Sequence, residues 1–341
     1  MTTQLKQVLM QPNLLTPEIA NAITSEIMKG NLGHSQIGAF LATLKLLGKE
    51  SQPSYIASIA KSMRDAALKV ETDYELVDIV GTGGDGQDTF NVSTAASIVA
   101  AGAGCKVAKH GNRASSSSCG SADVLEALGC KIQNVSPELC TKILDNGNFC
   151  FLFAQVFHPS MKFLSVPRKE LGVRTIFNIL GPLTNPAKAS KMIVGVYKRD
   201  LGRIMAETLI LLGVKRAWVV CGGIGLDEIS PEGETFVWET QADGSIAELV
   251  ISPKDFGLPE HPLSAVKGGD AAHNSNTMTD LLDGNLSGPV LDFVLLNSAA
   301  LLFVSGKVTS LPDGVELARK SINDGQAKEA LASFIKMSKE L

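Results

Sequence analysis

The sequence predicts an α/β fold in two parts: a small all-helical N-terminal domain, and a larger α/β domain with a mostly parallel central sheet flanked by helices. Residues 1 to about 70 show only helical periodicity, and from about residue 73 short apolar runs alternate with helical segments. The chain also has 341 residues, which is more than the roughly 250–300 that a single hydrophobic core serves. Together these observations favour two domains.

Three helices are expected in the N-terminal part. The segment 16-TPE-18 offers a cap and a first-turn proline, and isoleucines recur every four residues from Ile19 to Ile27. Further helices are expected over about 35–47 and 54–68. So few helices leave apolar faces uncovered, which favours a scaffold or a subunit contact over a catalytic role. One such face carries Ile37, Leu41, Leu44 and Leu47.

Strands and helices alternate in the second part, which favours a largely parallel sheet. The segments 234–240 and 246–252 favour an antiparallel hairpin added to this sheet. The apolar run 289–304 is interrupted by Asp292 and Asn297, which indicates a buried helix more than a membrane span. The other strands are expected at 76–80, 105–110, 149–154, 192–197 and 216–222, and the helices at about 93–104, 120–129, 137–146 and 201–213.

The composition argues against several classes of partner. Lys and Arg number 31 against 35 Asp and Glu, so the net charge is −4, without the basic excess of a nucleic-acid-binding protein. Six cysteines show no CxxC spacing, which favours reduced thiols in a cytoplasmic protein. The N-terminus lacks an apolar signal core, and we expect no membrane segment.

A glycine-rich turn, 81-GTGGDGQDTFNVST-94, follows the strand expected at 76–80. A turn of this kind between a strand and a helix exposes backbone N–H groups and lets an anion approach closely, so phosphate or pyrophosphate is the expected ligand. A simple tight turn is the alternative. Asn91, Ser93 and Thr94 either add side-chain donors to the anion or only cap the helix that begins there.

A second polar turn, 109-KHGNRASSSSCGS-121, follows the next strand. Adjacent turns of this kind open at the same edge of a parallel sheet, where ligands usually bind, although a solvated loop is the alternative. Two other phosphate-binding patterns do not fit. The chain has no G-x-x-x-x-G-K-[ST] motif, and the glycines of 81–86 do not have G-x-G-x-x-G spacing.

The whole chain resembles the anthranilate phosphoribosyltransferases. The resemblance implies transfer of the 5-phosphoribosyl group from phosphoribosyl pyrophosphate to the amine of anthranilate, with release of pyrophosphate, in the second step of tryptophan biosynthesis. It also implies Mg²⁺, with two ions per active site. The matching motifs are GTGGD at 81–85, FNVST at 90–94, KHGNRA at 109–114, GSADVLEALG at 120–129, RTIFNILGPLTNPA at 174–187 and GLDE at 225–228.

The resemblance also implies domains and site residues. Residues 1–72 with 171–190 would form the helical domain and a homodimer contact, and residues 73–170 with 191–341 the donor-binding domain. Catalysis would use positioning and charge stabilisation by Lys109 and Asn112, without a general base. Ser93, Asp227 and Glu228 would bind Mg²⁺, and Gly81, Asn112, His158 and Arg168 would bind anthranilate. The donor would contact Gly81, Gly84, Asp85, Thr89, Asn91, Val92, Ser93, Thr94, Lys109, His110, Gly111, Asn112, Arg113, Ala114, Ser115, Ser116, Ser117 and Ser121.

Several of these residues have simpler interpretations from the sequence alone. The carboxylates of 227–228 are equally consistent with a solvated loop, Arg168 with an exposed helix cation, and His158 with a helix start. Arg174 is expected to pair with Glu170 four residues earlier, so it is left outside the site.

One position departs from the family pattern. Ser118 stands where relatives often have a basic residue, which would leave more of the pyrophosphate contact to Lys109 and Arg113. The competing functions are a pyrimidine nucleoside phosphorylase of the same fold and a non-catalytic phosphate- or nucleotide-binding protein.

Overall fold

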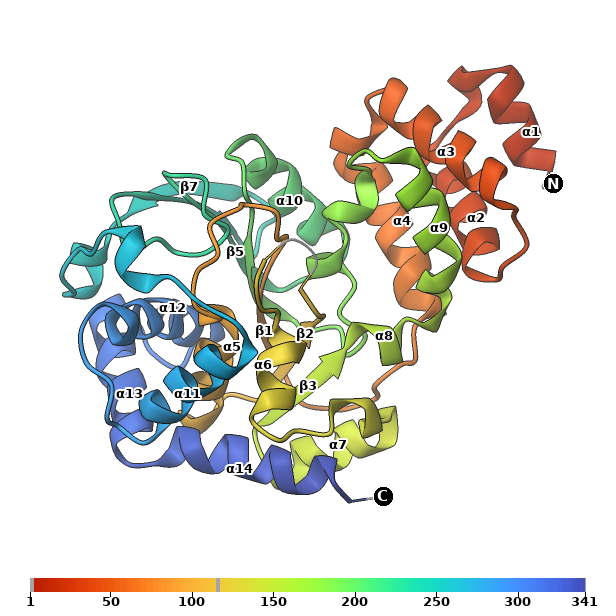
Figure 1. Ribbon diagram of the computed structural model, residues 1–341. Coiled ribbons are helices and arrows are strands. Elements are labelled where there is room, and N and C mark those ends of the chain that lie inside the picture. The colour runs from red at the N-terminus through yellow and green to blue at the C-terminus, as the bar shows by residue number, and fades with distance from the viewer. Residues whose placement is uncertain (1–2, 115–116, 341) are drawn as a thin grey trace.

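The computed structural model describes residues 3–114 and 117–340 and confirms the predicted fold class (Figure 1). A helical N-terminal part stands beside a larger part built on a seven-stranded sheet. The strands are β1 (Val77–Gly81), β2 (Val107–Gly111), β3 (Phe149–Phe153), β4 (Lys191–Gly195), β5 (Arg216–Gly222), β6 (Thr235–Thr240) and β7 (Ile246–Ile251). The helices are α1 (Thr3–Met10), α2 (Pro17–Met28), α3 (His34–Leu46), α4 (Pro53–Ala66), α5 (Val92–Gly102), α6 (Ser121–Ala127), α7 (Pro137–Asn146), α8 (Ala154–Phe157), α9 (Lys162–Leu171), α10 (Asp200–Leu211), α11 (Ala271–Leu282), α12 (Pro289–Ser305), α13 (Leu311–Asn323) and α14 (Gln326–Ser338).

The strand order of the sheet places both polar turns at one edge. The strands lie in the order β3-β2-β1-β4-β5-β6-β7. The first five pair in parallel, while β6 pairs antiparallel with β5 and β7, which confirms the expected hairpin. Because β1 and β2 are parallel neighbours, with Val77 opposite Val107, the turns that follow them open side by side, as predicted.

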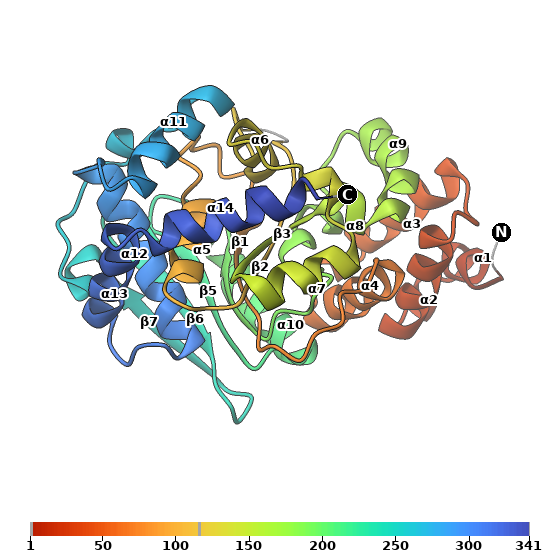
Figure 2. The ribbon, with the colours of Figure 1, turned by 90° about the horizontal axis from the view of Figure 1, so that it is seen from below.

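Helices cover the sheet and form most of the core. Helices α5, α12 and α14 pack against β1 to β4, and α10 packs against β5 and β6. Almost every residue of α12 from Phe293 to Leu302 is buried, as expected for a helix that is apolar all round. The helical part and α12–α13 lie at opposite ends of the molecule (Figure 2). Within the described residues, no helix is both long and apolar enough to span a bilayer.

The apolar face expected to remain uncovered on α3 is in fact buried. Ile37, Leu41 and Leu44 are buried because α9 and α1, neither of which the sequence pattern indicated, pack against α3. The exposed apolar side chains of the helical part lie instead near helix ends, where Leu46 is 86% and Met10 is 74% exposed.

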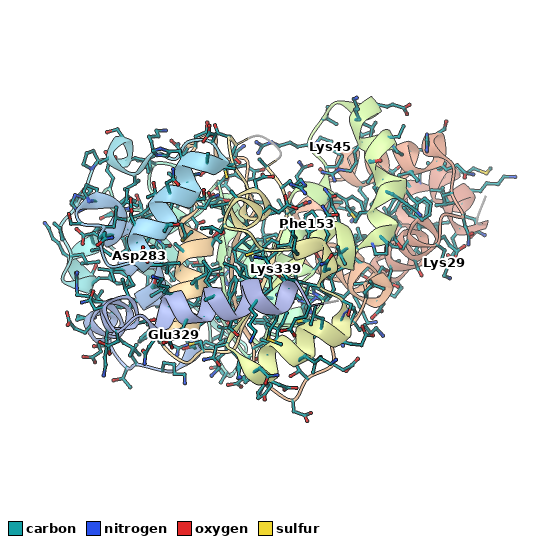
Figure 3. The ribbon with its side chains drawn as sticks, turned by 60° about the horizontal axis from the view of Figure 1, so that its bottom comes forward. Lys29, Lys45, Phe153, Asp283, Glu329 and Lys339 are labelled. Carbon is teal, nitrogen blue, oxygen red and sulfur yellow. The ribbon has the colours of Figure 1, made fainter. Side chains whose placement is uncertain are left out.

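The segment 171–190 crosses from α9 back to β4 through two short 3-10 turns, η5 (Ile176–Asn178) and η6 (Gly181–Leu183). Hydrogen bonds tie it to the helical part. Arg64 Nε on α4 donates to the Leu183 carbonyl at 2.7 Å, and Ile176 N donates to Glu50 Oε1 at 2.8 Å. Elsewhere, charged side chains such as Lys29 and Asp283, both labelled in Figure 3, are exposed.

Candidate active site

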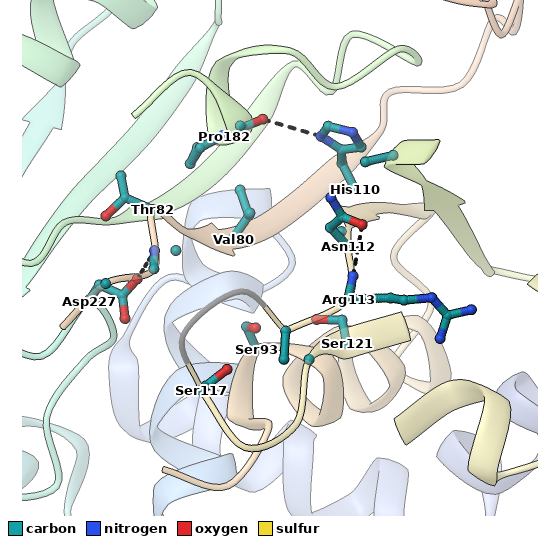
Figure 4. A pocket seen from close by; sticks show the side chains of 18 of the residues that line it. Val80, Thr82, Ser93, His110, Asn112, Arg113, Ser117, Ser121, Pro182 and Asp227 are labelled. Carbon is teal, nitrogen blue, oxygen red and sulfur yellow. Dashed lines mark hydrogen bonds between the residues drawn. The ribbon is translucent and has the colours of Figure 1, made fainter. Parts of the chain in front are cut away.

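A cavity of about 480 Å³ lies where β1 and β2 end. Its wall is completed by α9 and the segment 177–184, so both parts of the molecule contribute. Almost all of the site residues expected from the resemblance lie in this wall (Figure 4). Those found there are Gly81, Gly84, Asp85, Thr89, Asn91, Val92, Ser93, Lys109, His110, Gly111, Asn112, Arg113, Ala114, Ser117, Ser121, His158, Arg168, Asp227 and Glu228.

Three expected residues are not among these. Ser115 and Ser116 fall outside the described residues. Thr94 is fully buried on α5 and does not line the cavity. Its hydroxyl donates to Ser121 Oγ at 3.0 Å, so Thr94 supports a wall residue from behind.

The glycine loop, residues 81–86, is an open turn whose shape depends on glycine. Gly83, Gly84 and Gly86 have φ of +70°, +81° and +72°, a region that other residues rarely adopt. Gly81 has a different constraint, because a Cβ there would collide with Asp227. The conformation of this loop therefore depends on glycine, and the loop brings backbone close to the cavity.

Asp227 is not part of a solvated loop pair. It is buried beside the glycine loop, where Asp227 Oδ2 accepts a hydrogen bond from Gly83 N at 2.6 Å (Figure 4). Burial raises the pKa of Asp227 to about 7, and the nearby Asp85 carboxylate adds to the shift. Burial and the charge of Asp227 also raise the pKa of Glu228 well above its usual range, although Lys109 opposes this. Crowded carboxylates of this kind attract a cation.

Lys109 is a buried cation on β2, only 1% exposed. Its ammonium donates to the Ile79 carbonyl at 2.7 Å and to Ser93 Oγ at 3.3 Å. Burial lowers the pKa of Lys109, whereas the charges of Asp78 and Glu228 raise it. The ammonium is therefore held in place by the Ile79 carbonyl and the Ser93 hydroxyl, and the charges of Asp78 and Glu228 favour its protonated form.

Arg113 does not present its charge to the cavity as expected. Its guanidinium donates to Glu126 at 2.6 and 2.9 Å and to Asp123 at 3.1 Å, and lies over the Phe153 ring. Figure 4 shows this side chain extending away from Ser93. Asp123 and Glu126 lie on α6, directly after the polar turn. They bind the guanidinium of Arg113, which was expected to contact the pyrophosphate.

The opposite wall holds a cation of a different kind. Arg168 lies on α9 and faces the cavity, with its guanidinium carbon 6.0 Å from the centre of the Phe177 ring. Within residues 3–114 and 117–340, no carboxylate forms an ion pair with it. Arg168 is therefore not simply an exposed helix cation, because its unpaired charge lines the cavity. Met63, Met161 and Pro182 complete an apolar surface beside it.

Two histidines lie between these walls, with ring centroids 5.1 Å apart. Burial lowers the pKa of His110 to about 3 and of His158 to about 4, so both imidazoles are neutral at pH 7. His110 Nδ1 lies 3.2 Å from the Gly181 carbonyl (Figure 4), and His158 has a backbone hydrogen bond with Thr184. In both rings Nε2 has no hydrogen-bond partner in the part of the chain that the structure describes.

The sequence analysis missed residues that act over long separations. Asp78 is fully buried on β1 and accepts hydrogen bonds from Asn185 Nδ2 at 2.8 Å and from His110 N at 3.3 Å. Arg174 does not reach Glu170, because its guanidinium donates to the Gly84 carbonyl at 2.9 Å. Phe177 faces Arg168 from another segment. An isolated Asp inside an apolar strand was the one available signal for Asp78.

Comparison with known proteins identifies relatives along the whole chain. Residues 4–67 match the helical bundle domain of the glycosyl transferase family, and residues 73–328 match the a/b domain of the same family. An anthranilate phosphoribosyltransferase of Dehalococcoides mccartyi is 45% identical over 96% of this chain and 95% of its own length. Another from Schizosaccharomyces pombe is 45% identical over 92% of this chain and 90% of its own length.

Solved structures agree with these matches. The anthranilate phosphoribosyltransferase of Saccharomyces cerevisiae, in complex with PRPP and Mg, is 33% identical over 99% of this chain and 98% of its own, with a TM-score of 0.91. The enzyme of Thermus thermophilus is 38% identical over 99% of both chains, with a TM-score of 0.88.

Proposed function

The chain belongs to the anthranilate phosphoribosyltransferase family, and we propose that the cavity between its two parts carries out that family's reaction. The enzyme transfers the 5-phosphoribosyl group from phosphoribosyl pyrophosphate to the amine of anthranilate, giving N-(5-phosphoribosyl)anthranilate and pyrophosphate in tryptophan biosynthesis. One observation carries the proposal: the glycine loop and Arg168, which has no ion-pair partner among the described residues, line the same cavity.

We assign the donor to the wall at the ends of β1 and β2. The glycine loop supplies backbone N–H groups, and Lys109 supplies a fixed positive charge where negative charge grows on the leaving pyrophosphate. Ser117 and Ser121 add hydroxyls. Since Arg113 is paired with two carboxylates, we assign to it only a backbone contact and a role in shaping the turn.

We assign the acceptor to the wall formed by α9 and the segment 177–184. A planar guanidinium binds a carboxylate through two parallel hydrogen bonds, and Arg168 is the cation here without a carboxylate partner among the described residues. Phe177 and Met63 offer apolar surfaces to the aromatic ring. Asn112 also lines the cavity; its Oδ1 accepts a hydrogen bond from Arg113 N at 2.8 Å, and its side-chain amide would orient the amine.

The residues present also fit Mg²⁺, which we propose as a requirement with two ions per site. Within the described ranges, no three His, Cys, Asp or Glu side chains form a preformed metal centre. Mg²⁺ does not need one, since it commonly binds one or two carboxylates together with substrate phosphates and water. Asp227, Glu228 and Ser93 would hold it, and it would help neutralise the charge of the pyrophosphate.

The chemistry needs positioning more than proton transfer. The amine lone pair forms a bond to ribose C1, the bond from C1 to the pyrophosphate oxygen breaks, and its electron pair leaves with pyrophosphate. The nitrogen then loses one proton to water. An aromatic amine is already neutral and nucleophilic at pH 7, so we assign no general base, and the two neutral histidines serve as walls.

We also propose the wider organisation of the protein. Residues 1–72 with 171–190 would form the helical domain and a homodimer contact, and residues 73–170 with 191–341 the donor-binding domain. All six cysteines are free and buried, which supports a reducing, cytoplasmic location. For the dimer, Leu46→Asp tests the contact: sedimentation should show folded monomers, and a native-like dimer would place the contact elsewhere.

The test of function follows the loss of anthranilate fluorescence. Purified protein with anthranilate, phosphoribosyl pyrophosphate and Mg²⁺ should consume the fluorophore and release an equal amount of pyrophosphate. Leaving out the metal or the donor should stop both. Donor binding without any turnover would instead indicate a non-catalytic sensor, and cleavage of nucleosides by inorganic phosphate would indicate a phosphorylase.

A further inference from the structure

Arg174 bridges the two parts of the molecule at the edge of the cavity. Its backbone is held by the helical part, because Lys45 Nζ on α3 donates to the Arg174 carbonyl at 2.8 Å. Glu50 accepts from Ile176 N at 2.8 Å and pairs with Lys45 at 3.2 Å, so the strap, residues 172–176, is fastened at two points. Lys45 lies on the helical part, near the segment that follows α9 (Figure 3).

The side chain of Arg174 crosses to the other part. Its Nη2 donates to the Gly84 carbonyl at 2.9 Å, and its guanidinium carbon lies 4.5 Å from the centre of the Tyr197 ring, just after β4. A stacked, planar guanidinium has fewer orientations open to it than a free one. Arg174 therefore connects α3 to the glycine loop, although it lies 90 residues after Gly84 in the sequence.

The contact between Arg174 and the Gly84 carbonyl also fixes the direction of the Asp85 N–H, which belongs to the same peptide plane. The structure has no cis peptide among its described residues, and in a trans peptide the carbonyl and the N–H of one plane point in opposite directions. Holding the Gly84 carbonyl toward Arg174 therefore directs Asp85 N–H to the other side of the loop. Gly84 and Asp85 line the cavity and Arg174 does not. No described residue accepts a hydrogen bond from Asp85 N.

We propose that Arg174 is a positioning residue for the donor: it fixes the Gly84–Asp85 peptide so that Asp85 N–H faces the pyrophosphate, and it makes this orientation depend on the helical part. The inference rests on the proposed function and deepens it. Glycines at 83, 84 and 86 leave the loop many alternative conformations, so an external contact is needed to select one. Gly83 N is already held by Asp227 on one side, and Arg174 supplies the contact on the other.

The test compares Arg174→Ala with Arg174→Lys and with Arg203→Ala, a control that removes an exposed arginine on α10 paired only with surface glutamates. Arg174→Ala should raise the KM and the directly measured Kd for phosphoribosyl pyrophosphate about 5- to 20-fold, which is less than for a charge-assisted hydrogen bond made directly to a substrate, because the loop keeps its contact with Asp227. The KM for anthranilate should change less than twofold. Arg174→Lys should recover part of the loss, and Arg203→Ala should match wild type.

A double-mutant cycle tests the connection through the strap. Lys45→Ala, which is outside the cavity wall, should raise the donor KM about 2- to 5-fold, and combining it with Arg174→Ala should add almost nothing. An unchanged donor KM in Arg174→Ala, or an equal rise for both substrates, overturns the inference. Additive losses would remove the link to the helical part. If wild type itself binds no donor, the proposed function fails first, so the two failures are distinguishable.

Discussion

The two cations at the cavity are held in opposite ways. Lys109 is a strand residue, almost completely buried, whose ammonium is bonded to the Ile79 carbonyl and balanced by Asp78 and Glu228. Arg168 is a helix residue, partly buried against Phe177, and it has no ion-pair partner among the described residues. Burial lowers the pKa of Arg168 without any opposing charge.

This difference indicates which charge belongs to the fold and which is completed by a substrate. A buried charge is tolerated only with a partner, so Lys109 is part of a permanent arrangement that is present before the donor arrives. Arg168 is arranged to obtain its partner from outside, as a carboxylate on the acceptor would provide. Substitution of Lys109 should therefore affect folding, whereas substitution of Arg168 should affect substrate affinity.

The largest effect is expected from Lys109→Met, which keeps the side-chain length and removes the charge. Asp78 and Glu228 would lose their counter-charge in a buried site, and breaking such an arrangement typically costs about 3–5 kcal/mol. We expect a loss of that size in the free energy of unfolding, measured in urea, together with loss of detectable turnover. If the variant unfolded at the same urea midpoint as wild type, the idea that Lys109 stabilises the fold would be contradicted.

For the acidic pair Asp227 and Glu228 we expect the reverse of Lys109→Met, namely a loss of turnover with little change in folding stability. The double variant Asp227→Asn with Glu228→Gln removes two crowded charges whose ionised forms burial disfavours. Folding should change little, because an amide oxygen at 227 still accepts from Gly83 N. Turnover should fall roughly 10²- to 10³-fold, as when one preorganised electrostatic contact is lost. Normal turnover at limiting Mg²⁺ would show that the metal binds elsewhere.

A third test concerns Asp78, which burial gives a pKa of about 6 against an ordinary value of 3.8, while Lys109 opposes the shift. Because the folded state binds this proton more tightly, the stabilisation is complete below about pH 3.8 and is lost as the pH rises through about 6. The unfolding free energy of wild type relative to Asp78→Asn should fall by up to about 3 kcal/mol between pH 4 and 7. If the unfolding free energies of wild type and Asp78→Asn changed in parallel with pH, the raised pKa of Asp78 would be contradicted.

The two walls also differ in how far the sequence could predict them. The donor wall is built from contiguous motifs that each follow a strand, so the local pattern alone predicted an anion-binding turn at residues 81–94, whereas the role of Lys109 came from the family resemblance. The acceptor wall joins α9, Phe177 and Met63, which only the folded chain brings together, and α9 contains Pro167 and was not among the helices assigned from periodicity. Arg168 and His158 were predicted through the family resemblance and not through their own surroundings.

Local pattern also failed on the donor wall where side chains compete. Arg113 was expected to face the pyrophosphate because it lies in a dense polar turn. Asp123 and Glu126 stand ten and thirteen residues later on α6, and they hold its guanidinium instead. The reach of a long side chain across a turn is decided by tertiary geometry, which spacing in the sequence does not give. The same reason explains why Arg174 contacts Gly84 and not Glu170.

The smallest expected effect concerns the acceptor wall, where Arg168→Ala should leave the fold intact. No described residue depends on this guanidinium for an ion pair, so the unfolding free energy should stay within about 0.5 kcal/mol of wild type. The variant removes a charge-assisted contact with the substrate carboxylate worth roughly 1.5–3 kcal/mol. At about 1.4 kcal/mol per decade, this corresponds to on the order of 10- to 200-fold.

The loss in Arg168→Ala should appear mainly in the KM for anthranilate. The carboxylate is distant from the bond that forms, so it is held about equally before and at the transition state, and kcat should change little. The KM for the donor should also change little, since Lys109 and the glycine loop are untouched. Steady-state kinetics with each substrate varied would decide this, with Arg203→Ala as the matched surface control. A defect confined to the donor would mean that Arg168, like Lys109, belongs to the donor wall, and the contrast between the two cations would then be wrong.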